Sequence, residues 1–551
     1  MQSENMTDHF FQSLPEHPLL QNFPRGISGQ NLPPTGAWED PKKVLESFPY
    51  QPGGLYHGMI DAKRIGINTD AHILTIGGSR SGKGTSSIIP NLILGYTGSA
   101  IILDPKGELA SITAGRRGKG IRENKAGLGQ KVFILDPFNA SSRPERHSFN
   151  PLDLIPLYLR AEDGSNQENT LLVDDAALVA ESLIIRSENG SDHWDDTAQD
   201  LLKGLILYVL LEESGTGRNL IRVREILRSG DIENRHKSNL FSSEETVLPE
   251  APEKPSELLE WTLNRMVCLS EKTVGDTSLC RARQIMGACA SSLLAKPDGE
   301  RGSVLSTARR HTQFLDSDPM RDVLSRSSEG FSLADLKKEK MTVYICFPAG
   351  RMATHHRWLR LLISMTLEMM ERDKKSKPDF PVLFLLEEFP VLGHMRSIET
   401  AVGQIAGFGV KLWFIIQDIP QLQKHYPHSW ETFVGNSGVV QCFGMNDNTT
   451  LEYVSKRLGT TSIVMVSETG VSMTTIGTGN TGKSWSVSET TLMTPEEVSR
   501  FFSGRQNLQI LFVPGLYPLV TQKVDYFKDN ELVGCYDPDP RYRKCADIKG
   551  V

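Results

Sequence analysis

The sequence predicts an α/β protein with a mostly parallel central sheet and an inserted all-α domain. Short, continuous apolar runs rich in β-branched residues recur along the chain, and unbroken strands of this length are typical of a parallel sheet covered on both faces. A long stretch between the third and fourth runs carries helical stripes instead. With 551 residues, 39% hydrophobic and 23% charged, the chain has room for about three to four folding units.

The N-terminal segment, residues 1–55, is predicted to be an extended arm. It holds eight of the 30 prolines and shows little hydrophobic periodicity. The longest apolar runs, such as Leu201–Leu211, fall short of the roughly 20 residues that span a bilayer, so we expect no transmembrane segment and no signal peptide. The seven cysteines lack paired spacing, which indicates free thiols in a reducing compartment.

The predicted strands form two groups. Three precede the helical stretch, at Ile73–Ile76, Ala100–Leu103 and Val132–Leu135, and five follow it, at Val343–Phe347, Val382–Leu386, Leu412–Ile416, Val439–Phe443 and Leu508–Val513. Helices that return to the sheet are predicted at His356–Glu371, Ile398–Ala406, Thr450–Leu458 and from Thr494, where Thr494 and Glu497 form a capping box. The Ser/Thr/Gly-rich segment Ser462–Thr491 is predicted to be a loop.

These elements divide the chain into five parts. They are a proline-rich arm (1–55), the first part of a nucleotide-binding domain (56–175), the inserted all-α domain (176–330), the second part of the nucleotide-binding domain (331–530) and a C-terminal tail (531–551). The sheet domain is therefore predicted to be built from two separate stretches of sequence.

A glycine-rich turn between the first strand and a helix is the most informative segment. It is predicted to bind the phosphates of a nucleotide through Gly77, Gly78, Ser79, Arg80, Ser81, Gly82, Lys83, Gly84, Thr85 and Ser86. Backbone N–H groups and a helix N-terminus face the phosphates in such a loop, and Lys83 supplies positive charge to the β and γ oxygens. Gly84 stands where a hydroxyl would bind Mg²⁺. Either Thr85 takes over this role, or the metal is held mainly by water and a carboxylate.

A second segment, Gly477–Ser484, matches the phosphate-loop pattern letter for letter. The residues that follow it, from Trp485, lack the apolar period of a helix, so no helix dipole would face a phosphate there. We therefore predict that Lys483 takes no part in nucleotide binding.

Polar residues follow the strands Val382–Leu386 and Leu412–Ile416. An ATPase of this architecture needs a carboxylate at the end of a neighbouring strand to hold Mg²⁺ and to orient the attacking water. We assign Glu387, together with Thr85, to the metal and Glu388 to the water. Gln417 is predicted to sense the γ-phosphate or place the water, with a hydrogen bond to loop backbone as the alternative. Three arginines are candidates for a catalytic residue supplied by a neighbouring subunit, namely Arg396, Arg457 and Arg505. Of these we assign Arg396 to catalysis.

The net charge of −7 argues against a chain that coats nucleic acid through its bulk charge. Local basic clusters remain at Arg116–Gly120, Arg309–His311 and Lys337–Lys338. Each is interpreted either as part of a basic channel or as a solvated face.

Several motifs together resemble the TraG/TrwB-type coupling proteins of conjugation and type IV secretion. They are Gly82–Thr85 leading to Ile89–Leu92, Asp104–Glu108, Phe149–Asp153, Trp194 with Ala198, Leu201 and Leu202, Leu385–Pro390, and Ile416–Gln417 followed by Gln421 and Leu422. The resemblance runs from about residue 70 to residue 530. It also accounts for Gly84, because a glycine after the loop lysine is common in that family, whereas Glu387 stands where the family usually has aspartate.

The resemblance implies a RecA-like, HerA/FtsK-related P-loop ATPase that uses ATP and Mg²⁺ and assembles as a hexamer. Such proteins recruit relaxase-bound single-stranded DNA, effector proteins or both, and deliver them to the type IV secretion channel at the inner membrane. Family members usually carry N-terminal transmembrane helices. Because we expect no transmembrane segment in this chain, we expect it to be cytoplasmic and held at the inner membrane by partners. Two alternatives stay open: a low-turnover nucleotide-binding adaptor for protein substrates, and an FtsK/HerA-like cytoplasmic translocase on double-stranded DNA.

Overall fold

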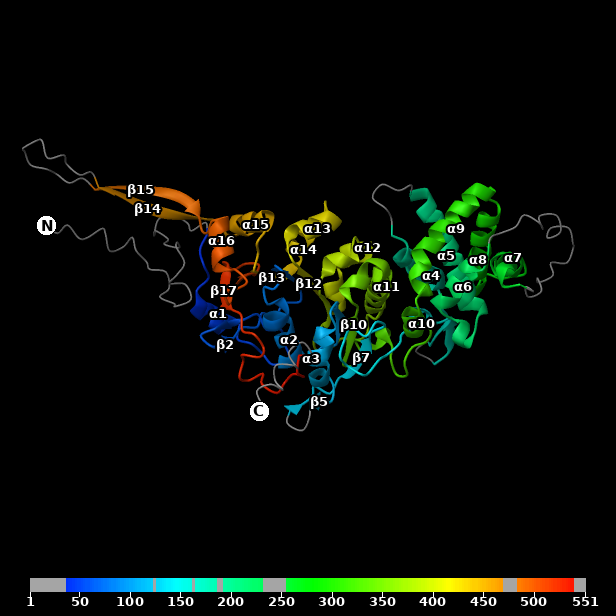
Figure 1. The fold of residues 1–551 in the computed structure, drawn as a ribbon, viewed down its shortest axis with the longest axis horizontal. Coiled ribbons are helices and arrows are strands. Elements are labelled where there is room, and N and C mark those ends of the chain that lie inside the picture. The colour runs from blue at the N-terminus through cyan, green and yellow to red at the C-terminus, as the bar shows by residue number, and fades with distance from the viewer. Residues whose placement is uncertain are drawn as a thin grey trace, which may run out of the picture.

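A large central sheet organises the computed structural model, which describes residues 36–121, 125–160, 164–185, 192–230, 254–468 and 483–539 (Figure 1). The sheet has 11 strands in the order β2-β1-β17-β16-β13-β3-β12-β11-β4-β10-β7. In chain order these are β1 (Met59–Ile60), β2 (Lys63–Arg64), β3 (His72–Gly77), β4 (Ala100–Asp104), β7 (Lys131–Leu135), β10 (Met341–Cys346), β11 (Val382–Leu386), β12 (Val410–Ile416), β13 (Ser437–Phe443), β16 (Leu508–Phe512) and β17 (Leu519–Gln522).

The sheet is mostly parallel, as predicted. All neighbours from β13 to β7 run parallel, whereas the edge from β2 to β13 is antiparallel. Every residue of β4, β10, β11 and β12 is buried. Alternate residues of one strand enter different cores: Ile101 and Leu103 pack on one face, and Ala100 and Ile102 on the other. Unbroken apolar runs are therefore what this doubly covered sheet requires.

Helices cover both faces of the sheet. The helices α2 (Ile89–Leu94) and α3 (Glu108–Arg117) contribute buried residues to one core, and α11 (Ala349–Arg372) and α12 (Arg396–Ala401) contribute to the other. The remaining helices on the sheet side are α1 (Pro41–Ser47), α13 (Ile419–His425), α14 (Trp430–Gly435), α15 (Asn448–Leu458) and α16 (Pro495–Phe501). The capping box of α16 is confirmed: the Glu497 N–H donates to Thr494 Oγ1 at 3.3 Å, and the Thr494 N–H donates to Glu497 Oε2 at 2.9 Å.

The described residues between 172 and 324, namely 172–185, 192–230 and 254–324, form helices and no strand. They are α4 (Leu172–Leu183), α5 (Asp192–Glu212), α6 (Leu220–Arg228), α7 (Leu258–Glu271), α8 (Ser278–Leu294), α9 (Asp298–Thr312) and α10 (Asp318–Leu324), most of them gathered at the right of Figure 1. Central helix α5 buries Ala198, Leu201, Leu202 and Leu205. This spacing puts one continuous apolar stripe on α5, as expected for a helix packed among others.

The predicted loop at Ser462–Thr491 is wrong where the structure describes it. Strands β14 (Thr460–Glu468) and β15 (Lys483–Thr491) form a two-stranded antiparallel ribbon, in register from Thr460–Thr491 to Glu468–Lys483. The ribbon projects away from the sheet in Figure 1. Its sequence is rich in valine and threonine, whose branched side chains favour strands, and the serine and glycine content obscured that preference.

Part of the segment predicted as an arm is folded onto the sheet domain. Asp40 caps α1 by accepting the Lys42 N–H at 2.9 Å, and Trp38, Val44 and Leu55 are buried. Residues 1–35 lie outside the described residues. Among the residues that are described, no helix combines the length and the apolarity needed to cross a membrane, and the cysteines are free thiols.

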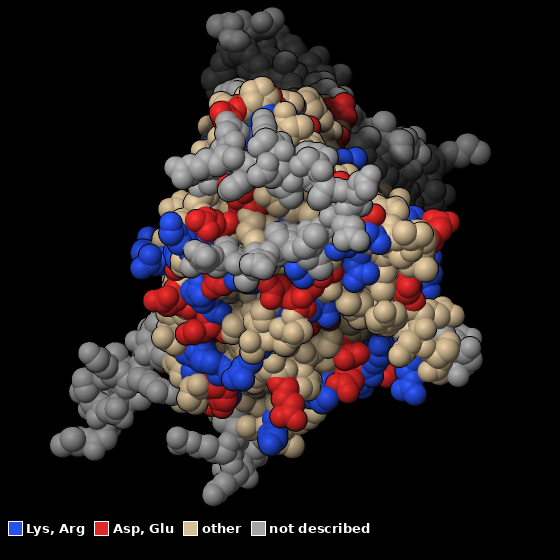
Figure 2. Space-filling view, turned by 90° about the vertical axis from the view of Figure 1, so that its right-hand side faces the viewer, with Lys and Arg blue, Asp and Glu red and all other residues tan. Residues whose placement is uncertain are grey.

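The basic clusters are partly structural, which corrects the interpretation that each is a channel wall or a solvated face. Arg117 is completely buried and donates to the carbonyl oxygens of Tyr96 and Gly98, to Thr342 Oγ1 and to Gln130 Oε1. Lys337 is also buried and donates to two carbonyl oxygens. In the view from the helical end, Figure 2, Lys and Arg are interspersed with Asp and Glu over the visible face. That face therefore carries no continuous basic surface.

Arg117→Met is expected to destabilise the chain by about 3 kcal/mol or more, because several buried oxygens lose their donor at once. Lys119→Met is the control, since Lys119 belongs to the same cluster and is exposed. Urea unfolding followed by circular dichroism measures both. Equal midpoints for the two variants would contradict the structural role of Arg117.

Candidate functional site

The glycine-rich segment lies between strand β3 and a continuous helical stretch, as predicted. Strand β3 ends at Gly77, a turn follows, and the helix starts at Lys83 with a π-helical turn that leads into α2. Gly82 has φ 92°, a conformation that favours glycine. A Cβ on Gly78 would lie 2.2 Å from the carbonyl oxygen of Gly444, so the loop backbone passes too close to its neighbour for any side chain.

Lys83 lies back across the loop. Its ammonium group donates to the carbonyl oxygens of Gly77 and Gly78, the latter at 3.1 Å. Burial lowers the pKa of Lys83, while the carboxylates of Glu388 and Glu387 favour its charged form. The loop therefore holds a largely desolvated cation beside two acidic side chains.

Glu387 and Glu388 have different environments although they are adjacent. Glu387 is 8% exposed, and burial, with a smaller contribution from the Asp104 carboxylate, raises its pKa to about 8. Glu388 has φ 54°, which is uncommon for a residue other than glycine and is often found at functional sites. The side-chain amide of Gln417 donates to both carboxylate oxygens of Glu388, at 3.2 and 3.1 Å. Gln417 thus orients Glu388, and its amide does not take the alternative partner, loop backbone.

The sheet topology explains why these residues meet. Strands β3, β12, β11 and β4 are parallel neighbours, so their carboxyl ends lie at one edge of the sheet. Gln417 and the two glutamates follow β12 and β11 directly, Asp104 is the last residue of β4, and Lys83 begins the helix after the turn that follows β3. Ligands of open α/β sheets bind at this edge, and the arrangement fits phosphate transfer to water.

Thr85 has a side-chain partner from the C-terminal part of the chain. Its hydroxyl donates to Asp525 Oδ1 at 2.8 Å, and Asp525 belongs to the segment after β17. The assignment of Thr85 and Glu387 to Mg²⁺ stays a prediction. Among the described residues no group of three or more His, Cys, Asp or Glu side chains could hold a metal. Mg²⁺ commonly takes one or two carboxylates, keeps several waters and completes its shell with substrate phosphates.

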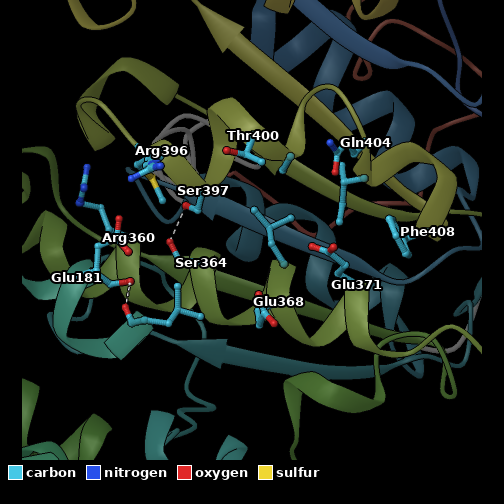
Figure 3. Close-up of a pocket in the computed structure, with 16 residues that line it drawn as sticks. Glu181, Arg360, Ser364, Glu368, Glu371, Arg396, Ser397, Thr400, Gln404 and Phe408 are labelled. Atoms are coloured by element: carbon cyan, nitrogen blue, oxygen red, sulfur yellow. Dashed lines mark hydrogen bonds between the residues drawn. The ribbon is translucent and has the colours of Figure 1, made fainter. Parts of the chain in front are cut away.

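The three candidate arginines lie in different parts of the fold, and Arg505 follows Gly504, which approaches Ser81 of the phosphate loop. Arg396 is the first residue of α12. It lines a cavity of about 260 Å³ together with Glu181, Arg360 and other residues of α11 (Figure 3). No residue of the glycine-rich loop lines this cavity. The Arg457 guanidinium lies 4.5 Å from the centre of the Phe512 ring. Arg505 is exposed. A role for any of them toward a neighbouring subunit stays a prediction.

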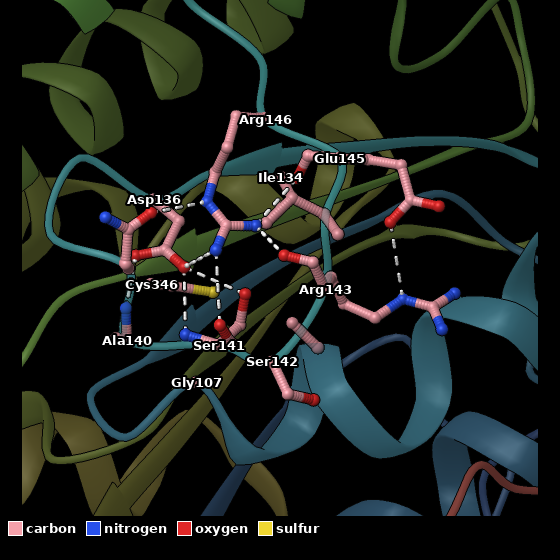
Figure 4. Close-up of polar contacts among 12 residues, drawn as sticks. Gly107, Ile134, Asp136, Ala140, Ser141, Ser142, Arg143, Glu145, Arg146 and Cys346 are labelled. Carbon is pink, nitrogen blue, oxygen red and sulfur yellow. Dashed lines mark hydrogen bonds and ion pairs between the residues drawn. The ribbon is translucent and has the colours of Figure 1, made fainter.

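Two further carboxylates lie at strand ends on this edge of the sheet. Asp136, after β7, accepts the N–H groups of Ala140 and Ser141 and the Ser141 hydroxyl, at 2.7 to 2.8 Å, and lies 3.3 Å from the Arg146 guanidinium (Figure 4). Its oxygens are therefore occupied within the fold. Asp104 is completely buried, Oδ1 has no hydrogen-bond partner, and burial raises its pKa to about 6.

Four residues at or beside the loop received no role from the sequence: Asp104, Lys106, Lys523 and Asp525. Asp104 comes directly after the apolar residues of β4, as Glu387 comes after those of β11, and this signal could have identified it. Lys523 donates to the carbonyl oxygen of Ser81 at 2.9 Å. No local pattern marks Lys523 or Asp525, because folding alone brings their segment to the loop.

The pKa of Glu387 makes stability depend on pH. Because that pKa is about 8 in the folded chain against an ordinary value of 4.5, the folded state retains a proton between these values. Stability therefore falls as pH rises from about 5 to 8. Glu387→Gln is expected to stabilise the chain relative to wild type at pH 8.5, by on the order of a few kcal/mol, and less at pH 6. Thermal melting at both pH values measures this, with exposed Glu431→Gln as the control. A gain that is equal at both pH values would refute it.

The family profile described as type IV secretory system conjugative DNA transfer matches residues 36–546. The conjugal transfer protein TraG of Escherichia coli is 28% identical over 543 residues, which cover 93% of this chain and 77% of TraG. Protein VirD4 of Rhizobium radiobacter is 28% identical over 464 residues, which cover 84% of this chain and 58% of VirD4.

Solved structures share the fold. The unbound bacterial conjugative coupling protein TrwBdeltaN70 matches with a TM-score of 0.59 at 13% identity, over 91% of this chain and 95% of that chain. The plasmid coupling protein TrwB in complex with the ATP analogue ADPNP matches with a TM-score of 0.60 at 13% identity, over 91% and 96%. The predicted RecA-like P-loop fold is confirmed. With the profile covering nearly the whole chain, this protein belongs to the conjugative DNA transfer family of type IV secretory systems.

Proposed function

We propose that this chain is an ATP-hydrolysing coupling protein that delivers substrates to a type IV secretion channel. The observation that carries the proposal is the contact between Gln417 and both oxygens of Glu388, near the half-buried Lys83. A strand-end carboxylate held by an amide and facing a phosphate loop is what the activation of a water molecule requires. TrwB, whose fold this chain shares, has been solved with ADPNP and with ADP and Mg²⁺.

Each residue of the cluster has one task in this proposal. The loop from Gly77 to Ser86 binds the phosphates, and Lys83 leaves its carbonyl partners to pair with the β and γ oxygens. Glu388 accepts the proton of the attacking water, and Gln417 fixes the direction of that carboxylate. Glu387, with Thr85, would hold Mg²⁺, and the metal would supply charge that offsets the phosphates. Burial raises the pKa of Glu387 in the protein alone, and a cation held there would favour its ionised form.

The proposed partners are those expected of a member of this family. We propose a hexamer that acts on single-stranded DNA with its relaxase, on effector proteins, or on both, at the inner membrane and through contact with the channel components. The relatives TraG and VirD4 and the profile description support a role in DNA transfer. We also propose that residues 176–330 act as an inserted domain and that Arg396 acts toward a neighbouring subunit.

Phosphate release by the purified chain tests the proposal. Mg·ATP hydrolysis is expected, and single-stranded DNA is expected to increase it. Binding without turnover, with or without DNA, would instead favour the low-turnover adaptor. Stimulation by double-stranded DNA alone would favour the cytoplasmic translocase. Loss of plasmid transfer from cells that lack the gene, restored by the wild-type gene, tests the role in secretion.

A further inference from the structure

The turn between β4 and α3 carries a lysine, Lys106, beside the acidic end of β11. Leu103 of β4 is in register with Leu386 of β11. Asp104 and Glu387, the next residues, therefore lie opposite each other across the two parallel strands. Both leucines belong to the core that α11 covers, so the two carboxyl groups project toward the other face, that of α2 and the phosphate loop. Lys106 thus leaves the sheet next to Glu387.

The turn that carries Lys106 is held firmly. The Gly107 N–H donates to the carbonyl oxygen of the last residue of β4 at 3.2 Å, and Gly107 has φ 66°, which favours glycine. A Cβ on Gly107 would lie 2.4 Å from backbone atoms of Ala140 and Ser141. The N–H groups of those two residues donate to the Asp136 carboxylate, so the segment behind the turn is also fixed (Figure 4). The backbone at Lys106 therefore has the rigidity that a catalytic position requires.

The fold does not use the ammonium group of Lys106. Lys106 is exposed, and among the residues that the structure describes no hydrogen bond or ion pair holds its side chain. Arg117 and Lys337, by contrast, are buried and donate to carbonyl oxygens. Lys83 also has partners, the carbonyl oxygens of its own loop. The donors of Lys106 are therefore available to a ligand at this edge of the sheet.

Lys106 and Lys83 influence the same groups, although they follow different strands. Burial is the largest cause of the lowered pKa of Lys83, and the charge of Lys106 lowers it further. Burial raises the pKa of Glu387, with a smaller contribution from Asp104, and the charge of Lys106 opposes that rise. Because like charges repel at short range, two neighbouring ammonium groups are suited to a ligand that carries several negative charges.

The strand order places the two lysines on either side of the acidic pair. Lys83 follows β3, Glu387 and Glu388 follow β11, and Lys106 follows β4, while the order in the sheet is β3-β12-β11-β4. A phosphoryl group that is transferred beside Glu388 therefore has Lys83 on one side and Lys106 on the other.

We propose that Lys106 is a second catalytic cation, whose ammonium group contacts the γ-phosphate of the nucleotide in its own subunit. The inference rests on the proposed function. In that reaction the water oxygen bonds to the γ-phosphorus, the bond to the β–γ bridging oxygen breaks, the proton passes to Glu388, and ADP and inorganic phosphate leave. Lys106 stabilises the negative charge that builds up on the γ oxygens during this step, and its flexible four-carbon stem carries the charge across from β4.

Lys106→Gln is expected to lower kcat on the order of a hundredfold, as for the loss of one preorganised donor. The KM for ATP is expected to change by less than about threefold, because the contact strengthens mainly in the transition state. Lys106→Arg keeps the charge and is expected to restore most of the lost turnover. Lys424→Gln is the matched control, because Lys424 is an exposed lysine of α13, the helix that follows β12. It is expected to behave as wild type.

A binding measurement separates catalysis from support of the fold. Isothermal titration compares ADP alone with ADP plus aluminium fluoride, which stands in for the transferred phosphoryl group. Lys106→Gln is expected to bind ADP as wild type does and to bind ADP with aluminium fluoride about tenfold more weakly or worse, because only the second ligand has a group at the γ position. A lysine that only supports the fold would change both affinities equally, and that result overturns the inference.

A mixing experiment tests whether Lys106 acts in its own subunit. Equal amounts of Lys106→Gln and Lys83→Ala chains are combined, and phosphate release is measured. No recovery is expected, because each chain lacks one of the two cations that its own site needs. Recovery of turnover would direct Lys106 to the nucleotide of a neighbouring subunit and overturn the assignment.

The remaining outcomes separate this inference from the proposed function. A wild-type chain that hydrolyses ATP, together with a Lys106→Gln chain of equal kcat, overturns this inference and leaves the proposed function intact. A Lys106→Arg chain as slow as Lys106→Gln also overturns it, since the charge alone is then not what matters. A wild-type chain without turnover overturns the proposed function, and this inference with it.

Discussion

Lys83→Ala is expected to lower ATP turnover by a factor on the order of 10² to 10³ or more. Lys83 supplies the side-chain cation that faces both Glu387 and Glu388 from the phosphate loop. Without it the charge that develops on the γ-phosphate in the transition state meets the two carboxylates without the lysine ammonium between them. Phosphate release at saturating Mg·ATP measures the loss.

Lys483→Ala is the matched control for the loop lysine. Lys483 belongs to the segment that fits the phosphate-loop pattern in sequence, yet it begins strand β15 and not a helix. The reason for rejecting that segment is thus confirmed for the part that is described, while residues 477–482 lie outside the described residues. Wild-type turnover is expected in this variant. If Lys483→Ala were the inactive variant, the assignment of the phosphate loop would be wrong.

Glu388→Gln is expected to leave ATP binding nearly unchanged and to lower hydrolysis on the order of a hundredfold or more. The amide keeps the size of the side chain but cannot accept the proton of the attacking water. The substitution also disturbs the contact with Gln417, because in the wild type the Gln417 amide donates to both carboxylate oxygens of Glu388. Isothermal titration measures binding, and phosphate release measures turnover.

The comparison for Glu388 is Glu452→Gln, the same change at an exposed position of α15. It is expected to behave as wild type in both measurements. Normal turnover in Glu388→Gln would remove Glu388 from the catalytic role. A loss of ATP binding as large as the loss of turnover would assign Glu388 to binding instead.

Local sequence patterns predicted the core of this fold because a buried strand and a phosphate loop are both recognised from residues that are neighbours in the chain. Runs such as Ala100–Leu103 and Val382–Leu386 must be strands buried on both faces, since alternate residues enter both cores. The phosphate loop was found because a strand, a turn that needs Gly82 at positive φ, and a helix follow one another within a few residues. Strand ends likewise placed Glu387, Glu388 and Gln417, because parallel strands share one carboxyl edge.

Other features were predicted wrongly because amino-acid composition does not show which segments pair or which side chains are buried. The ribbon of β14 and β15 was predicted as a loop because its serine and glycine content outweighed its strand-forming residues, and only the partner strand makes it a ribbon. Arg117 has the sequence context of a surface cluster, yet it is buried because the carbonyl oxygens of Tyr96 and Gly98 converge on it.

The sequence by itself determined the strands, the phosphate loop and the acidic strand end, since each depends on periodicity or on residues that are neighbours in the chain. Tertiary structure alone decided what lies beside them. Thr85 meets Asp525 across 440 residues of sequence, and the segment from Lys523 to Asp539 lines a cavity beside the phosphate loop that no local sequence pattern predicts. The physical reason is that a long-range contact depends on strand order and crossover geometry, whereas a hydrophobic period reports only which face of its own element is buried.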